Sequence, residues 1–187
     1  MRTTPKISDL FAPLETCISE KIIPALFNQY DSKMRKLISL PAKLGGLGIF
    51  IPSDVTETEY AYSKTITAPL VELIIRQELS FDPLSSIGNK IKIAKSSIAA
   101  KKLASFKTLQ ASLMVDDNTR SIIHHQTQKG TSLWLTTLPI ANLGFVMNST
   151  EFHDALCLRY NVRVANTPKF CACSKVNSVE NFKKVHN

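Results

Sequence analysis

Apolar residues along this chain recur mainly at intervals of three and four positions, which is the spacing of one helical face. Near the N-terminus Leu14, Ile18 and Ile22 form such a stripe. Pro24 is expected to kink or end that helix, because proline lacks the amide hydrogen that a helix interior needs. A second short helix is predicted over 33–40, and Pro41 stops it.

A glycine-rich turn follows in the run Leu-Gly-Gly-Leu-Gly at 44–48. Three glycines so close together indicate a tight backbone path, with Leu44, Leu47 and Ile49 pointing inward. The run lacks the Lys-Ser/Thr pair of a phosphate-binding loop and does not open a clear strand–helix unit. We therefore interpret it as packing geometry.

Four further helical segments are predicted. One runs from Val55 to about Leu79 and is expected to break at Pro69. The stretch 83–115 has the pattern of a long amphipathic helix. Asp116-Asp117-Asn118 can cap the next helix, through His125, and 148–151 resembles a capping arrangement for a last helix over 151–160.

The pattern as a whole predicts a mainly α fold, an irregular bundle of about six or seven helices with an extended or irregular crosspiece around Trp134. The predicted core takes the large apolar residues of these stripes. They are Ile18, Ile22, Leu47, Ile74, Trp134, Leu138, Phe152 and Leu156.

Composition places the chain among globular proteins and gives it a basic character. Of its 187 residues 44 % are hydrophobic, and 23 Lys and Arg against 15 Asp and Glu leave a net charge of +8. Such a surplus favours polyanionic partners, RNA or DNA, without determining the fold. We find no pattern of a secretory signal and no apolar run near the roughly 18 residues that span a bilayer. We therefore expect an intracellular protein, nuclear or cytoplasmic, without a membrane partner.

The strongest charge feature is the stretch 83–115, which holds six lysines and no acidic residue. A basic helix of this kind can follow a phosphate backbone, and its plainer interpretation is a solvated helix face. The candidate phosphate contacts are Lys90, Lys92, Lys95, Lys101 and Lys102.

No catalytic constellation emerges from the sequence. Asp116 and Asp117 invite comparison with the paired metal-binding aspartates of a polymerase, but those lie on a strand hairpin with a third carboxylate. Here the flanking segments are helical, so helix capping is the better explanation. His124 and His125 are adjacent and point about 100° apart on a helix, so they cannot chelate one ion together. We therefore expect no enzymatic activity from this chain.

Cys171 and Cys173 are the candidate metal ligands. Two thiolates so close together can bind Zn²⁺, but a structural zinc site needs four ligands, and the tail adds only Glu180 and His186. The pair is too close for an ordinary structural disulfide, which favours a reducing compartment. We expect no cofactor, and we regard zinc at this pair as the weaker interpretation.

Several stretches resemble the region directly downstream of the polymerase in reverse transcriptases of invertebrate retrotransposons, of the non-LTR type. Three lie in the first half: RTTPKISDLFAPLETCISEKIIPAL, LISLPAKLGGLGIFIPSD and EYAYSKTITAPLVELI. A fourth, KGTSLWLTTLPIANLGFVMNSTEFHDALCLRYNV, resembles the next part of the same reading frames. Together they cover most of the chain.

This resemblance implies that the catalytic palm would lie upstream of Met1. It divides the chain into a thumb or linker remnant over 1–52, a basic helical domain over 53–165, and a truncated Cys/His knuckle over 166–187. The positions that match the family's four zinc ligands are Cys171, Cys173, Asn181 and Val185. Asn and Val cannot replace an imidazole and a thiolate, so the knuckle is degenerate.

Two functions stay open from the sequence. The first is a non-catalytic fragment of a retrotransposon polyprotein that holds RNA or DNA through its lysine-rich helix. The second is a structural or protein-interaction remnant without biochemical activity.

Overall fold

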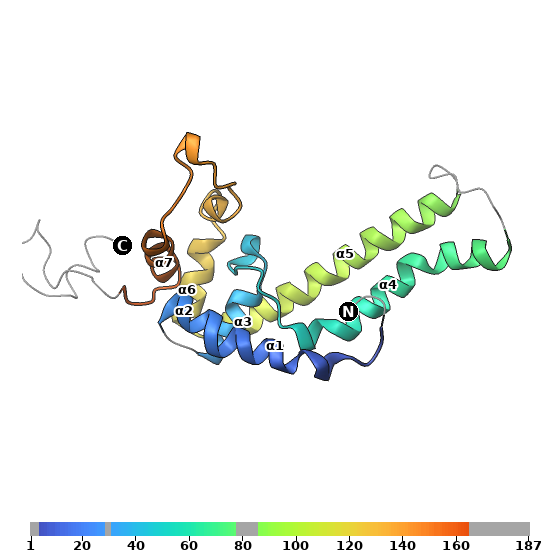
Figure 1. The fold of residues 1–187 in the computed structure, drawn as a ribbon, viewed down its shortest axis with the longest axis horizontal. Helices are drawn as coiled ribbons and strands as arrows, with labels where there is room; N and C mark the ends of the chain where they lie inside the picture. The colour runs from blue at the N-terminus through green and yellow to red at the C-terminus, as the bar shows by residue number, and fades with distance from the viewer. Residues whose placement is uncertain (1–3, 29–30, 78–85, 165–187) are drawn as a thin grey trace, which may run out of the picture. The chain divides into compact units, whose positions relative to one another are not determined.

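The computed structural model describes residues 4–28, 31–77 and 86–164, and it divides the chain into two compact units, Met1–Phe145 and Val146–Asn187. The predicted helical fold is confirmed, and the described residues contain no strand (Figure 1). Because α1, η2 and α2 form one continuous helix, these residues hold six helices in all.

The N-terminal helix passes through Pro24 instead of ending there. It consists of η1 (Ser8–Phe11), α1 (Ala12–Cys17), the π-helical segment η2 (Ile18–Ile22) and α2 (Ile23–Phe27). Pro24 cannot donate a hydrogen bond to the carbonyl four residues earlier, and the amide of Ile23 reaches back five residues to the carbonyl of Ile18. The wider π turn thus absorbs the proline, and the helix ends only at Asn28, whose φ is 56°.

Helix α3 (Ser32–Ser39) begins at Asp31, whose carboxylate accepts from the Lys33 amide at 3.1 Å, and ends before Pro41 as predicted. The short helix η3 (Ala42–Leu44) and the glycine run then fold back over the end of α3. There the amides of Leu47 and Gly48 donate to the carbonyls of Ile38 and Leu40 at 3.1 and 2.8 Å. The loop thereby satisfies carbonyls that a helix end leaves open.

Gly46 is the residue that permits this close approach. A Cβ at this position would lie 1.9 Å from the Leu40 carbonyl oxygen and 2.8 Å from that of Leu37. No side chain fits there, so the glycine run is packing geometry, as the sequence indicated.

Helices α4 (Pro52–Ile75) and α5 (Ser86–Leu113) form an antiparallel hairpin within the first unit, and its joined ends lie away from α1, α2 and α3 (Figure 1). The prediction of a helix break at Pro69 is wrong, because α4 continues past this residue to Ile75. The buried or half-buried positions of α4 continue at alternating steps of three and four on both sides of the proline, so packing against α5 holds the helix together there. The positions that follow this spacing are Thr56, Glu59, Ser63, Ile66, Leu70 and Leu73.

The rest of the first unit is α6 (Asp117–Gln126) and an irregular stretch with two short turns, η4 (Leu133–Leu135) and η5 (Ala141–Leu143). Trp134 lies in η4 and is half-buried. The second unit contains α7 (Ser149–Arg159) among its described residues. A reciprocal capping box starts α7, where the Asn148 amide donates to Glu151 at 2.8 Å and the Glu151 amide donates to Asn148 at 2.9 Å.

The predicted core is half right. Ile18 and Leu156 are buried, and Leu47 and Trp134 are half-buried. Four residues are exposed instead: Ile22, Ile74, Leu138 and Phe152.

Three of these errors have local reasons. The π turn shifts the buried face by one position, so Ile23 is buried in place of Ile22. On α4, Leu73 is buried at the position of the helix that faces α5, where the sequence predicted Ile74. Leu138 follows η4 in irregular backbone, where the helical spacing used for the prediction no longer applies.

Candidate nucleic-acid interface

Helix α5 carries the predicted lysines on two flanks. Four of them, Lys90, Lys92, Lys95 and Lys101, are exposed. The apolar seam of α5, which faces α4, runs through Ile91, Ala94 and Ile98. At about 100° per residue, Lys90 and Lys101 fall on one side of this seam and Lys92 and Lys95 on the other.

Lys102 has a different place from the other four. It lies at a seam position, half-buried, and forms an ion pair with Glu59 of α4. Its ammonium group also lies 5.3 Å from the centre of the Tyr62 ring. This lysine joins the two helices of the hairpin. The seam position of Lys102 is visible in the sequence, because Lys102 follows Ile98 by one helical turn.

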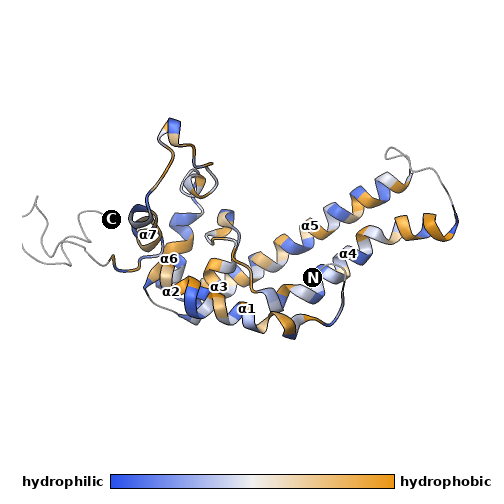
Figure 2. Ribbon diagram, in the orientation of Figure 1, coloured by the Kyte–Doolittle hydropathy of each residue, from blue (hydrophilic) through white to orange (hydrophobic). Residues whose placement is uncertain are grey.

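The outward face of α5 between the two lysine flanks holds the small exposed residues Ser96, Ala100 and Ala104, together with exposed Ile93 and Lys107. Hydropathy along α5 is accordingly mixed, whereas the C-terminal end of α4 is strongly apolar (Figure 2). Helix α5 itself has no acidic residue, so it is the most basic element among the described residues.

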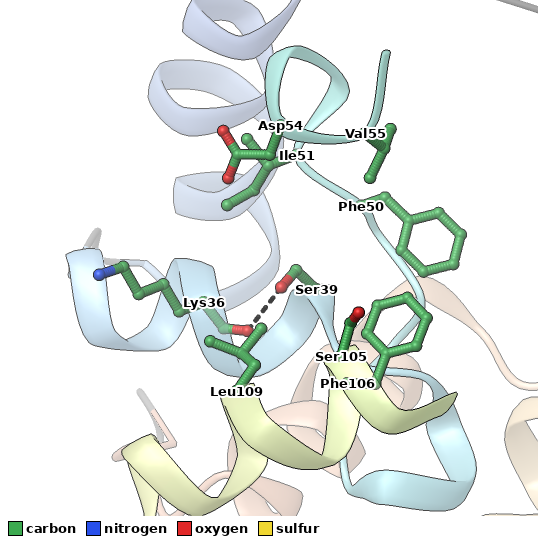
Figure 3. Close-up of a pocket in the computed structure, with 9 residues that line it drawn as sticks. All are labelled: Lys36, Ser39, Phe50, Ile51, Asp54, Val55, Ser105, Phe106 and Leu109. Atoms are coloured by element: carbon green, nitrogen blue, oxygen red, sulfur yellow. Dashed lines mark hydrogen bonds between the residues drawn. The ribbon is translucent and has the colours of Figure 1, made fainter. Parts of the chain in front are cut away.

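A small hollow of about 210 Å³ lies at the base of the hairpin, where α3, the start of α4 and α5 meet (Figure 3). Its walls are mostly apolar. The rings of Phe50 and Phe106 stack there with centroids 5.6 Å apart, and Lys36 points away from them (Figure 3). Phe50 is 45 % exposed, which leaves part of an aromatic face open beside a basic helix.

No pattern in the sequence indicated the polar cluster around Arg35, which is buried on α3. Its guanidinium group donates two hydrogen bonds of 2.7 Å to the Glu15 carboxylate. It also donates to the backbone carbonyls of Ile49 and Phe50, at 2.7 and 3.0 Å. Arg35 therefore joins α1, α3 and the segment that leads into α4, and the hydrogen bond from Arg35 lowers the pKa of Glu15.

Asp116 and Asp117 serve a helix terminus, as predicted. The Asp116 carboxylate accepts from the amide and the hydroxyl of Thr119, at 2.9 and 2.7 Å, and these bonds lower its pKa. Asp117 is exposed in the first turn of α6 and pairs with Arg120 at 2.7 Å. His124 and His125 are exposed near the other end of α6, with ring centroids 5.8 Å apart.

A small polar group lies on α7. The His153 Nδ1 atom is 3.1 Å from an Asp154 carboxylate oxygen, and its Nε2 atom is 3.7 Å from the Cys157 Sγ atom. Cys157 is fully buried, and desolvation, with a smaller contribution from the Asp154 charge, raises the pKa of its thiol. A thiol in these surroundings is not an activated nucleophile.

The predicted ligands Cys171 and Cys173 lie outside the described residues. Within the described part of the chain, no group of three or more His, Cys, Asp or Glu side chains is arranged to hold a metal ion. Among its helices, none combines the length and the apolar character needed to cross a membrane.

Comparison with known proteins identifies no relative. No protein-family model matches the chain, and neither the curated proteins nor the solved structures give a significant match.

Proposed function

We propose that this chain binds nucleic acid without catalysing a reaction, and that α5 supplies the phosphate contacts. The observation that carries the proposal is the set of four exposed lysines on a helix without acidic residues: Lys90, Lys92, Lys95 and Lys101. Each lysine that neutralises a phosphate releases a condensed counterion, so affinity falls as salt rises. Lys102 is not in this set, because it pairs with Glu59 inside the hairpin.

The placement of the lysines favours a double-stranded partner. Lys90 and Lys101 lie about 16 Å apart along the helix axis, close to five base steps of 3.4 Å. Two basic flanks on either side of this outward face match two phosphate backbones on either side of a groove. The major groove of B-DNA admits a helix, whereas that of A-form RNA is too deep and narrow. The preferred partner in this proposal is therefore duplex DNA.

The decisive experiment is a fluorescence anisotropy titration of the full chain with a short DNA duplex and a single-stranded RNA at increasing salt. We expect the duplex to bind more tightly. Changing Lys90, Lys92, Lys95 and Lys101 to glutamate should weaken binding at least about a hundredfold and reduce the salt slope by about three to four.

A matched control distinguishes the loss of the α5 site from a general loss of positive charge. Lys21, Lys33, Lys43 and Lys129 are also exposed but lie outside α5. Changing all four to glutamate lowers the net charge from +8 to 0, as the α5 variant does. The control should keep most of the affinity at moderate salt. Equal loss in both variants would mean that α5 is not the site, and absence of binding by the wild type at about 50 mM salt would end the proposal.

We also propose that this chain derives from the region behind the polymerase of a non-LTR retrotransposon. The four stretches that resemble such reverse transcriptases support this origin, and the helix-capping role of Asp116 agrees with it. In this proposal the catalytic carboxylates belong to a palm encoded upstream. A primer-extension assay with Mg²⁺ should therefore give no product, and DNA synthesis by the purified chain would contradict the proposal.

One observation favours the alternative of a protein-interaction remnant. Val71, Ile74 and Ile75 near the end of α4 are 48, 75 and 75 % exposed, and Figure 2 shows this end as apolar. Such a patch is typical of a contact surface. Sedimentation experiments test this alternative. It would be favoured if the wild type self-associates, Ile74→Glu does not, and the chain binds no nucleic acid.

A further inference from the structure

Phe50 presents an open aromatic ring at the base of the hairpin. The ring of Phe106 on α5 stacks against it, with centroids 5.6 Å apart and an angle of 24° between the two planes. Phe50 is nevertheless 45 % exposed. Because Phe106 covers one face of the ring, the exposed area lies on the opposite face and along the ring edge. A flat apolar face of this kind, next to a basic helix, is a surface on which a nucleobase can stack.

The backbone that carries this ring is held in place before any ligand binds. The guanidinium group of Arg35, whose side chain is only 4 % exposed, donates to the carbonyls of Ile49 and Phe50 at 2.7 and 3.0 Å. The Phe106 ring supports the Phe50 ring from the other side. A ring that is already fixed loses little freedom when a ligand stacks on it, so more of the stacking energy contributes to affinity.

The hollow beside the ring suits an uncharged planar group better than a phosphate. Its walls are mostly apolar and include one cation and one carboxylate, Lys36 and Asp54. Figure 3 shows both of these side chains on the side away from the two rings. Opposite charges in one hollow give little net attraction for an anion. At about 210 Å³ the hollow is also smaller than the roughly 300–1,000 Å³ of pockets that enclose a whole ligand, so it admits a single base.

One lysine flank of α5 leads towards this ring. At about 100° per residue, Lys92, Lys95 and Phe106 fall on the same side of the helix. The 11 residue steps from Lys95 to Phe106 correspond to about 16 Å along the helix axis, close to five backbone steps of 3.4 Å. A strand whose phosphates contact Lys92 and Lys95 can therefore place a base about five steps further on at Phe50.

We propose that Phe50 binds an unpaired nucleobase by stacking, on a nucleic acid whose paired part is held by the lysines of α5. This inference rests on the proposed function and specifies its ligand. Inside a duplex the neighbouring base pairs cover both faces of every base, so only an unpaired base can stack on an aromatic side chain. The preferred ligand is therefore a DNA duplex that opens into single strands, in place of a continuous duplex.

The test measures the affinity of the full chain for three DNAs by fluorescence anisotropy. The first is a fully paired duplex. The second is a fork of the same length whose strands are unpaired at one end over about six nucleotides, enough to span the five steps from Lys95. The third is the same fork with abasic sites in its unpaired arms. All three carry the same number of phosphates, so they differ in the bases that are free to stack.

We expect the fork to bind about five- to a hundredfold more tightly than the duplex, the range for stacking of one base on an aromatic side chain. The abasic fork should lose this advantage. Phe50→Leu should lower the affinity for the fork to about that for the duplex, because leucine keeps an apolar side chain but has no ring face. Phe50→Trp should keep the preference for the fork, because indole offers a larger face.

Phe145 provides the matched control. It is 54 % exposed but lies in the irregular stretch outside the hairpin, so Phe145→Leu should prefer the fork as the wild type does. If Phe50→Leu does not fold by circular dichroism, the abasic fork still tests the proposal, because it changes only the DNA.

The outcomes separate this inference from the proposed function. Equal affinity of the wild type for duplex and fork, or for the fork with and without its bases, overturns the stacking proposal and leaves duplex binding by α5 intact. An undiminished preference for the fork in a folded Phe50→Leu variant overturns it too. A wild type that binds none of the three DNAs overturns both proposals.

Discussion

The cluster around Arg35 and the outer surface of α5 use cationic side chains in opposite ways. Arg35 is buried, and its guanidinium group is held by one carboxylate and two backbone carbonyls from segments distant in the sequence. The lysines on the flanks of α5 are exposed and extend from a helix that has no acid of its own. One arrangement holds elements of the chain together, whereas the other leaves its charge available to a partner.

The buried cation that stabilises the first unit and the surface that we propose for binding therefore lie in separate parts of that unit. A buried cation must be paired, because an unpaired charge inside a protein is costly. An exposed cation gives little stability even when it is paired. Substitutions in the two regions should therefore have separable effects, which the following predictions test.

The largest effect is expected from Arg35→Ala. The change removes the guanidinium donor from the carbonyls of Ile49 and Phe50 and leaves the Glu15 carboxylate with the Ser19 hydroxyl in place of a cation. Breaking a buried pair typically costs about 3–5 kcal/mol. We expect a loss of free energy of unfolding near the lower end of that range, because Glu15 keeps a 23 % exposed side chain. Urea denaturation followed by circular dichroism measures it.

Arg120→Ala is the matched control for this prediction. Arg120 also contacts a carboxylate at 2.7 Å, that of Asp117, but both side chains are largely exposed. We expect a change of less than about 1 kcal/mol. Equal losses of free energy of unfolding in the two arginine variants would show that burial does not determine how much each ion pair stabilises the fold.

The next largest effect is expected from Gly46→Ala. The new Cβ would meet the Leu40 carbonyl oxygen at 1.9 Å, so the loop must move off the end of α3 and lose its hydrogen bonds there. We expect about 2–4 kcal/mol of destabilisation, within the range for strain and overpacking. An unchanged melting temperature would contradict the close contact.

A pH dependence should follow from Glu15. Its pKa is lowered in the folded chain, so the pair with Arg35 adds its full stability above the ordinary glutamate pKa, and this contribution is lost as pH falls through the lowered value. The free energy difference between wild type and Glu15→Gln should therefore be greatest near neutral pH and shrink below about pH 4. Denaturant titrations at several pH values measure it, and a constant difference would exclude the ion pair as its source.

The smallest stability effect is expected from Lys102→Met. The ion pair with Glu59 is partly exposed and lies at a seam position, so an apolar replacement should change the free energy of unfolding by less than about 1 kcal/mol. Lys101→Met, next to it but exposed, should weaken DNA binding more than Lys102→Met does. The reverse order in an anisotropy titration would place the contact surface elsewhere on α5.

Several helix ends could be predicted from the amino-acid sequence, because they depend on local chemistry. The Asp116 cap, the Asn148–Glu151 capping box and the stop at Pro41 involve neighbours a few residues apart. The position of Lys102 in the seam could also be predicted, since it follows Ile98 by one turn.

Which groups meet across the chain depends on the tertiary structure. Arg35 and Glu15 are 20 residues apart, so no periodicity could pair them. Pro69 does not end α4, because the burial that keeps this helix intact comes from α5, another element. The contact between the His153 ring and Cys157 likewise depends on side-chain rotamers. The spacing of two residues on a helix restricts these rotamers but does not select one. Local sequence patterns determine the backbone hydrogen bonds of the helices, whereas the burial of a side chain and the identity of its partners depend on which segments the fold brings together.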